Sequence, residues 1–253
     1  MINISKRKTR KLLHIIITIA VIISGNLCIN RYNETHDKAS ILEMEDSSVS
    51  VSKNNTSSST NYPIYAGKAY IVVNENIPQF NEKDLTRTDP FEEYSDLDSM
   101  GRCGTAYANI CIDLMPCEDR ESISEIKPSG WNNRQYDFID GGYIYNRCHL
   151  IGFQLAGENA NERNLITGTR YLNIEGMLPF ENMVADYVRE TRNHVLYRVT
   201  PLYSGENLVA DGVQMEGYSV EDQGSGISYN VFCYNVQPGC VINYADGFNW
   251  EDK

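Results

Sequence analysis

The middle of the chain contains the stretch Tyr145-Asn146-Arg147-Cys148-His149-Leu150-Ile151-Gly152. It predicts a short strand that runs into a loop containing glycine, with a histidine beside an arginine where the two meet. A neutral histidine is the side chain best suited to accept a proton near pH 7. Only His149 and His194 occur after residue 62. His194 begins a further expected strand, which favours a structural role for it and leaves His149 as the candidate base.

Carboxamide and carboxylate side chains follow His149 along the chain. The segment 157–164 (GENANERN) is rich in both, and Asn173 and Glu181 come next. Mg²⁺ prefers oxygen ligands and keeps several of its waters, so such residues can hold a hydrated cation beside a general base. A packed histidine followed by ordinary turns is the alternative. The sequence contains no Cys-x-x-Cys pair, P-loop or Gly-x-Ser-x-Gly motif, which disfavours the zinc, nucleotide and serine-hydrolase sites that use them.

Hydrophobic periodicity outlines a mixed α+β chain. The apolar spacing of Met177, Phe180, Val184 and Val188 predicts a helix over 179–191, with Pro179 in its first turn. A shorter helix is expected over 119–126. Expected strands cover 68–74, 101–113, 142–145, 194–203, 208–219 and 227–236. Because the last three are joined by short turns, the sheet should be mainly antiparallel.

The 253 residues divide into three parts. Residues 1–30 join a basic cluster to the apolar run Leu12–Ile23, which indicates a signal peptide or a retained signal anchor. Residues 31–62 are rich in serine, asparagine and acidic residues and indicate a flexible polar linker. Residues 63–253 should form one domain. We therefore expect a secreted or extracellular protein, attached to the membrane only through the N-terminal segment if that segment is not cleaved.

The charge balance bears on the class of partner. The formal net charge is -12, which is unusual for a protein that binds nucleic acid. The segment 102–170 is nearly neutral, however, with seven basic and nine acidic residues. Binding to a phosphate backbone requires a local positive groove rather than a basic protein. The acidity therefore predicts modest, salt-sensitive binding and does not exclude a nucleic-acid substrate.

Asn146-Arg147-Cys148-His149 resembles the Asp-Arg-Gly-His motif of the DNA/RNA non-specific endonucleases. The likeness is closest to the secreted and surface DNases of Gram-positive bacteria, including nucleases of DNA uptake. Asn164, Asn173 and Glu181 follow at the family's intervals of nine and eight residues, and Leu97–Arg102 resembles its Gly-Arg strand. The resemblance extends over roughly residues 67–247.

This resemblance implies the ββα-metal fold and an exported, Mg²⁺-dependent endonuclease without sequence specificity. DNA is the implied substrate, RNA is left open, and Mn²⁺ is an alternative cation. His149 would be the general base that activates the attacking water. Asn173 would bind Mg²⁺ directly, and Glu181 would hold water that is bound to the metal. The implied products carry 5′-phosphates.

Three further residues receive roles from the same resemblance. Arg102 and Arg147 would contact the phosphate, with Arg102 the better candidate for stabilising the transition state. Asn164 would support the loop or the histidine. Two positions depart from the family's pattern, because Asn146 replaces the usual aspartate and Cys148 replaces the usual glycine.

Cys148 leads to two other expectations. The family places the segments of Cys103 and Cys148 side by side, so a disulfide between them is suspected in an exported protein; two reduced, buried thiols are the alternative. A thiol hydrolase with Cys148 as nucleophile is disfavoured, because adjacent side chains on an extended chain point apart. A surface DNA receptor with weak or no catalysis remains the competing function, and the oligomeric state is open.

Overall fold

The computed structural model describes residues 62–253. The expected leader at 1–30 and all but the last residue of the expected linker at 31–62 lie outside this part. Among the described residues, no helix has the length and apolar character needed to cross a membrane.

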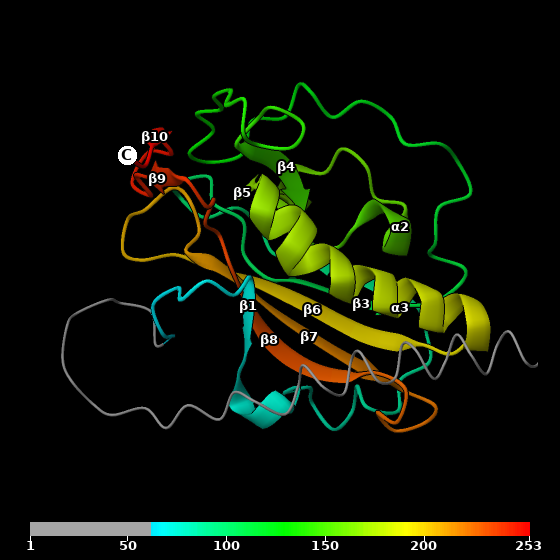
Figure 1. Cartoon of the computed structure of the whole chain (residues 1–253). Helices are drawn as coiled ribbons and strands as arrows, with labels where there is room; N and C mark the ends of the chain where they lie inside the picture. Colours follow the sequence, from blue (N-terminus) through cyan, green and yellow to red (C-terminus); the bar gives the residue numbers. More distant parts are fainter. Residues whose placement is uncertain (1–61) are drawn as a thin grey trace, which may run out of the picture. The chain divides into compact units, whose positions relative to one another are not determined.

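An antiparallel sheet of six strands forms the centre of the fold (Figure 1). The strand order is β1-β8-β7-β6-β3-β2. Its members are β1 (Tyr70–Val72), β2 (Phe91–Tyr94), β3 (Ala106–Ile110), β6 (Val195–Leu202), β7 (Gly212–Ser219) and β8 (Ser228–Tyr234). Every pairing between neighbours is antiparallel. The five expected strands in these regions are confirmed, each with fewer residues than the pattern suggested.

A ββα unit lies on one face of this sheet. β4 (Tyr145–His149) pairs antiparallel with β5 (Leu165–Thr169), and the register places His149 opposite Leu165. The chain then enters η3 (Leu172–Met177), a π-helical turn, and α3 (Leu178–Thr191), which crosses the sheet over β6 and β7 (Figure 1). The predicted helix at 179–191 and the α+β class with a mainly antiparallel sheet are confirmed. The strand expected at 142–145 instead begins at Tyr145.

The remaining elements are short. They are η1 (Asn74–Asn76), α2 (Phe153–Ala156), η2 (Glu162–Asn164), β9 (Cys240–Ile242) and β10 (Asn249–Glu251). β9 and β10 form a separate antiparallel pair beside β4 and β5 (Figure 1).

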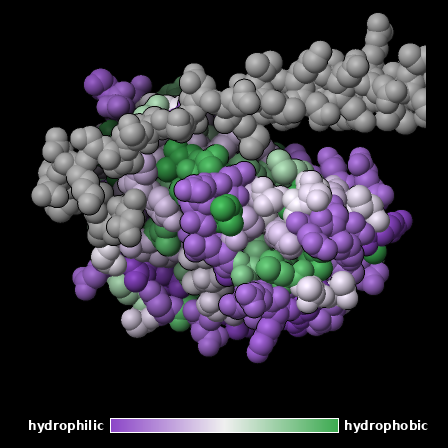
Figure 2. Space-filling view, turned by 90° about the horizontal axis from the view of Figure 1, so that it is seen from below, coloured by the Kyte–Doolittle hydropathy of each residue, from purple (hydrophilic) through white to green (hydrophobic). Residues whose placement is uncertain are grey.

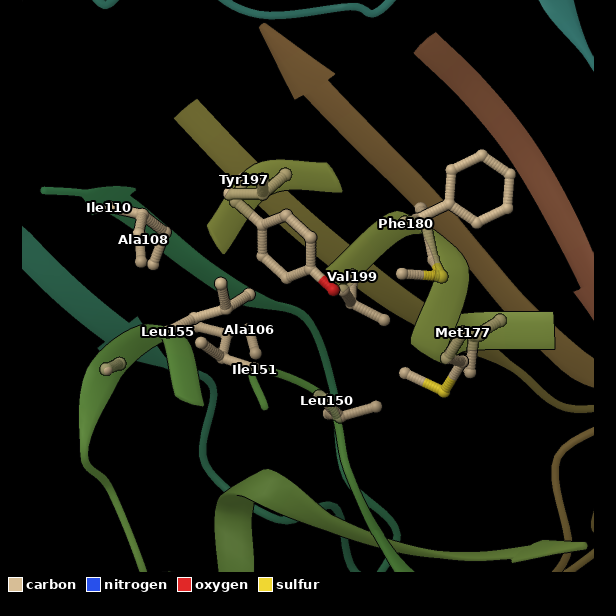
Figure 3. Packing of buried hydrophobic residues seen from close by; sticks show 14 of the residues in the cluster. Ala106, Ala108, Ile110, Leu150, Ile151, Leu155, Met177, Phe180, Tyr197 and Val199 are labelled. Carbon is tan, nitrogen blue, oxygen red and sulfur yellow. The ribbon is translucent and has the colours of Figure 1, made fainter. Parts of the chain in front are cut away.

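Apolar side chains from three parts of the chain share one core (Figure 3). Tyr197 and Val199 come from β6, Met177 and Phe180 from the η3–α3 segment, and Ile151 from the loop after β4. Fully burying a large apolar side chain contributes about 1.5–3 kcal/mol. Both the loop that follows His149 and the helical turn before α3 are therefore held by the main core.

A polar network on the sheet holds the segment that precedes β2. Glu216 of β7 is buried, and its carboxylate accepts hydrogen bonds from Arg198 Nε at 2.8 Å and from the Gln79 backbone N–H at 2.7 Å. A buried charge is tolerated only when it is paired and hydrogen-bonded, and the contacts of Glu216 with Arg198 and Gln79 meet this condition.

The surface is mainly polar on the side seen in Figure 2, which views the molecule from below relative to Figure 1. Polar residues make up most of the coloured surface there, between small apolar patches.

The helix expected at 119–126 was a wrong prediction. The segment is irregular, and two of its backbone carbonyls bind the guanidinium of Arg147. Nη2 donates to Ser124 O at 2.6 Å and Nε donates to Ile126 O at 2.5 Å. These contacts hold the end of the segment against β4 without a helix.

The suspected disulfide is also wrong. All the cysteines among the described residues are free. Cys103 Sγ lies 3.2 Å from Leu165 O at the start of β5, whereas Cys148 Sγ lies 3.1 Å from Asn173 Oδ1 on η3. Both thiols are buried, and each contacts a different part of the ββα unit.

Candidate active site

A pocket of about 810 Å³ opens where β4, the loop after it and the start of α3 meet. Four of the six residues predicted for the site line it: Arg147, His149, Asn173 and Glu181. Segments between residues 120 and 181 thus bring together the candidate base, the candidate oxygen ligands and one candidate phosphate-binding arginine.

His149 ends β4 and is only 7% exposed. Its Nε2 lies 2.9 Å from the backbone oxygen of Asn159, and a carbonyl can only accept, so Nε2 carries the hydrogen. Nδ1 is then the acceptor, 3.3 Å from Nη2 of Arg120. Burial lowers the pKa of His149 to about 4, and the charge of Arg120 acts in the same direction. The ring is therefore neutral at pH 7, with a lone pair on Nδ1.

Asn173 and Glu181 bring two oxygen donors to the pocket. Asn173 lies in η3, and its Oδ1 accepts a hydrogen bond from the Cys148 thiol at 3.1 Å. Glu181 lies in the first turn of α3, where burial raises its pKa to about 7 against the opposing effects of Gln154 and Arg120. An amide oxygen and a carboxylate suit a hard cation that keeps most of its waters.

Gly152 makes room for the Glu181 carboxylate. A Cβ at position 152 would lie 2.7 Å from Glu181 Oε2 and 2.9 Å from Cδ. The carboxylate thus occupies a space that only glycine leaves open. This space holds the Glu181 oxygens in the pocket that also contains Asn173, as a cation site requires. No group of three or more His, Cys, Asp or Glu side chains arranged to hold a metal ion occurs in the range 62–253.

Two arginines reach the pocket in different ways. Arg147 is held by the carbonyls of the 119–126 segment and stacks 4.4 Å from the centre of the Trp131 ring. Arg120 is exposed and lies against His149. Arg120 was not predicted from the sequence, because a single arginine on an expected helix carries no signal beyond that of a solvated face.

Arg102 does not line the pocket. Its Nε forms an ion pair with Asp98 Oδ2 at 2.7 Å, and Nη1 donates to Gly205 O and Asn207 O at 2.8 and 3.0 Å. Its guanidinium also stacks over the ring of Tyr203. The structure therefore places this arginine in a loop-binding position outside the pocket.

Asn164 is fully buried and makes two hydrogen bonds with the backbone of Ile151. Its Oδ1 accepts from Ile151 N at 2.8 Å, and its Nδ2 donates to Ile151 O at 3.0 Å. Asn164 thereby joins the loop after His149 to the start of β5. This position suits the loop-supporting role that was one of the two expected for it.

Comparisons with known proteins also indicate a nuclease. A family model described as DNA/RNA non-specific endonuclease matches residues 82–221. No curated protein matches the chain. NucA from Streptococcus agalactiae, solved with a magnesium ion bound, is 24% identical with a TM-score of 0.67, over 76% of this chain and 91% of that one.

Two other solved structures have the same fold. Sda1 nuclease with a bound zinc ion is 27% identical with a TM-score of 0.64, over 73% of this chain and 97% of that one. A structure described as an extracellular endonuclease is 18% identical with a TM-score of 0.52, over 74% and 100%. The residues matched by the family model make up more than half of the sequence and include every lining residue of the pocket. The chain therefore belongs to the DNA/RNA non-specific endonuclease family and is a nuclease.

Proposed function

We propose that the protein is an exported endonuclease that depends on a divalent cation and hydrolyses phosphodiester bonds of DNA without sequence specificity, with RNA as a further candidate substrate. The observation that carries the proposal is the orientation of His149. Its Nε2–H is bound to Asn159 O, so that Nδ1 carries the lone pair and faces Nη2 of Arg120 in the pocket that also holds Asn173 and Glu181.

In this proposal His149 is the general base. Nδ1 takes a proton from the attacking water, while the hydrogen bond from Nε2 to Asn159 O keeps the ring in place. The low pKa of the buried ring means that it is already neutral before substrate arrives. The negative charge of a bound phosphate then raises that pKa and makes the imidazole a stronger base.

Asn173 Oδ1 would hold the cation, and the Glu181 carboxylate would hold water that is bound to it. Bound Mg²⁺ offsets negative charge on the phosphate and on the leaving 3′ oxygen. Mn²⁺ takes similar oxygen ligands and is the expected substitute. Because burial raises the pKa of Glu181 to about 7, this carboxyl loses its proton when the cation binds. The metal ions named in the NucA and Sda1 structures support a divalent cation in this fold.

Arg147 and Arg120 would contact the phosphate. Arg147 is fixed by two carbonyls and a ring, which holds its charge in one place. Arg120 takes the position that we predicted for Arg102, because it is the arginine beside His149 Nδ1. Guanidinium groups bind phosphate oxygens through paired N–H donors. Attack by water with the 3′ oxygen as leaving group yields 5′-phosphate ends.

Export rests on the basic and apolar segment at residues 1–30. The domain is proposed to act outside the cell, either free or attached through that segment if it is not cleaved. Structures of an extracellular endonuclease and an extracellular nuclease with the same fold support this location.

The test compares His149→Ala with His194→Ala in the full-length protein. His194 is the matched control, since it pairs with Glu221 outside the pocket. Each protein is incubated with supercoiled plasmid or single-stranded RNA, in Mg²⁺ or EDTA. We expect His149→Ala to lower the nicking rate by about 100- to 10,000-fold, and EDTA to stop the wild type. A folded wild type that binds plasmid and leaves it intact would establish the DNA-receptor function instead.

A further inference from the structure

Two exposed aromatic rings and an arginine lie on segments that adjoin residues of the active-site pocket, through the chain neighbour Asn133 and through Tyr145. Phe248 and Trp250 are 45% and 44% exposed, and their ring centres are 6.0 Å apart. The guanidinium of Arg134 lies 5.1 Å from the centre of the Phe248 ring. We call Arg134, Phe248 and Trp250 the aromatic platform.

The exposure of these rings follows from the strand register. Between them, Asn249 is fully buried and donates to Asn132 O at 2.9 Å, while its Oδ1 accepts from the Tyr136 hydroxyl at 2.8 Å. Side chains alternate along a strand, so anchoring Asn249 directs Phe248 and Trp250 to the opposite face. The same alternation places Glu251 on the side of Asn249, away from the two rings.

Hydrogen bonds join the platform to a residue that lines the pocket. Tyr145 lines the pocket, and its hydroxyl donates to Gly247 O at 2.9 Å, one residue before Phe248. Arg134 Nη1 donates to Asn249 O at 2.7 Å. Beneath these contacts, a second small core joins residues 131–145 to the β9–β10 pair; it contains Ile139, Ile144 and Tyr145 with Trp131, Tyr136, Cys240 and Ile242.

The β9–β10 pair lies outside residues 82–221, which the family model matches. Contiguous exposed apolar surface is a feature of binding sites, and the rings of Phe248 and Trp250 are neighbours. A guanidinium next to two rings is suited to nucleic acid, because bases stack on aromatic side chains and phosphates pair with arginine. Bases inside a duplex already stack on one another, so only an unpaired strand offers free faces to the rings.

We propose that the aromatic platform binds unpaired bases of a single-stranded nucleic acid whose backbone continues into the pocket. The inference rests on the proposed nuclease function and adds to it a preference for strands with accessible bases. Tyr143, which is exposed and lines the pocket, lies on the segment that connects the two regions. Loss of one base stack is expected to weaken binding by about 5- to 140-fold.

The test measures binding by the full-length His149→Ala protein in Mg²⁺. Fluorescence anisotropy gives Kd for a labelled oligothymidine and for a blunt duplex of equal length. Trp250→Ala and Phe248→Ala are each compared with the parent and with Ile77→Ala, an exposed apolar residue outside the platform. We expect both platform variants to lose 5- to 140-fold in affinity for the single strand and less than twofold for the duplex, with Ile77→Ala unchanged.

Fluorescence provides an independent readout, since the chain has only two tryptophans, Trp131 and Trp250. In a Trp131→Phe variant of the same protein, oligothymidine should quench the emission of Trp250. Unchanged single-strand affinity in both platform variants, or equal losses for single strand and duplex, would overturn the inference.

Two further outcomes separate the possible failures. If Trp250→Ala and Phe248→Ala weaken single-strand binding while wild type cuts no substrate, the nuclease function fails and the platform stands. If sedimentation shows that the wild type forms dimers that dissociate on dilution, and both variants are monomers, the platform is an interface between copies and the inference fails.

Discussion

Gly152→Ala should lower the activity of the site while leaving the stability of the fold nearly unchanged. The backbone at Gly152 has φ -58° and ψ 142°, which alanine adopts without strain. The three atoms nearest to the added Cβ would all belong to the Glu181 carboxylate, at 2.7 Å for Oε2, 2.9 Å for Cδ and 3.1 Å for Oε1. The substitution therefore acts on the candidate metal site through one flexible side chain.

The size of the effect follows from these distances. Ordinary contact begins near 3.4 Å, so Oε2 must retreat by about 0.7 Å. Misplacing a catalytic group by about 1 Å can cost about 100-fold in rate, and disturbing a group that supports a metal typically costs about 10- to 100-fold. We expect nicking at limiting Mg²⁺ to fall by about 10- to 100-fold. Stability should change by less than about 1 kcal/mol, because the lower entropy of the unfolded alanine chain offsets the rotamer strain at Glu181.

A double-mutant cycle with Glu181→Ala tests the route of the effect. Isothermal titration gives the Mg²⁺ affinity, plasmid nicking gives the rate, and thermal unfolding gives Tm. Gly104→Ala is the matched control, since its Cβ would lie equally close, 2.7 Å, to Ser95 Cβ outside the pocket. Gly152→Ala should add nothing in the Glu181→Ala background. Wild-type nicking and Mg²⁺ affinity in Gly152→Ala, or additive losses in the cycle, would refute this reasoning.

Four other outcomes can be measured directly. The unfolded chain protonates His149 near pH 6.5, whereas the folded chain does so near pH 4. The free energy of unfolding should therefore fall by roughly 3 kcal/mol as the pH drops through that range. Chemical denaturation at each pH measures this fall, and His149→Gln should remove most of the pH dependence. With the pKa of Glu181 at about 7, its proton competes with Mg²⁺, and calorimetry should show about tenfold weaker Mg²⁺ binding at pH 6 than at pH 8, a difference that Glu181→Gln should remove. Arg120→Ala should lower kcat/KM for plasmid by about 100-fold, whereas Arg102→Ala should mainly lower Tm; the reverse pattern would restore the original assignment. Burial raises the pKa of the Cys148 thiol, so iodoacetamide should leave nicking intact while EDTA stops it, and rapid inactivation by the alkylator would revive the thiol-hydrolase alternative.

Long, strongly periodic segments were predictable from the sequence. The apolar spacing from Phe180 to Val188 marks the face of α3 that packs in the core, and the three strands after it are separated by clear turns. The helix expected at 119–126 failed for a physical reason. Its carbonyls bind Arg147, a residue more than 20 positions away, and local propensity contains no information about such a contact.

The candidate site was predictable where the motif at His149 and the intervals after it resemble those of the family. His149, Asn173 and Glu181 line one pocket because a strand, a π-helical turn and the start of a helix meet there. Arg102 and Arg120 could not be told apart by type. Arg102 pairs with Asp98, four residues before it, and binds two loop carbonyls, whereas Arg120 reaches the site on an irregular segment. Only the tertiary structure shows which of the two arginines binds partners outside the pocket and which one contacts His149.

The cysteine that replaces the family's glycine is accommodated by the opposite strand. Cys148 lies in the extended strand β4, and its φ is not among the positive values that favour glycine. Its side chain fills space above Gly168 of β5, where an added Cβ would lie 2.6 Å from Cys148 Cβ. This position in the β4–β5 pair thus has room for one side chain and not for two. Gly168 therefore leaves room for Cys148, whose thiol donates to Asn173 Oδ1 while His149 lies at the end of β4.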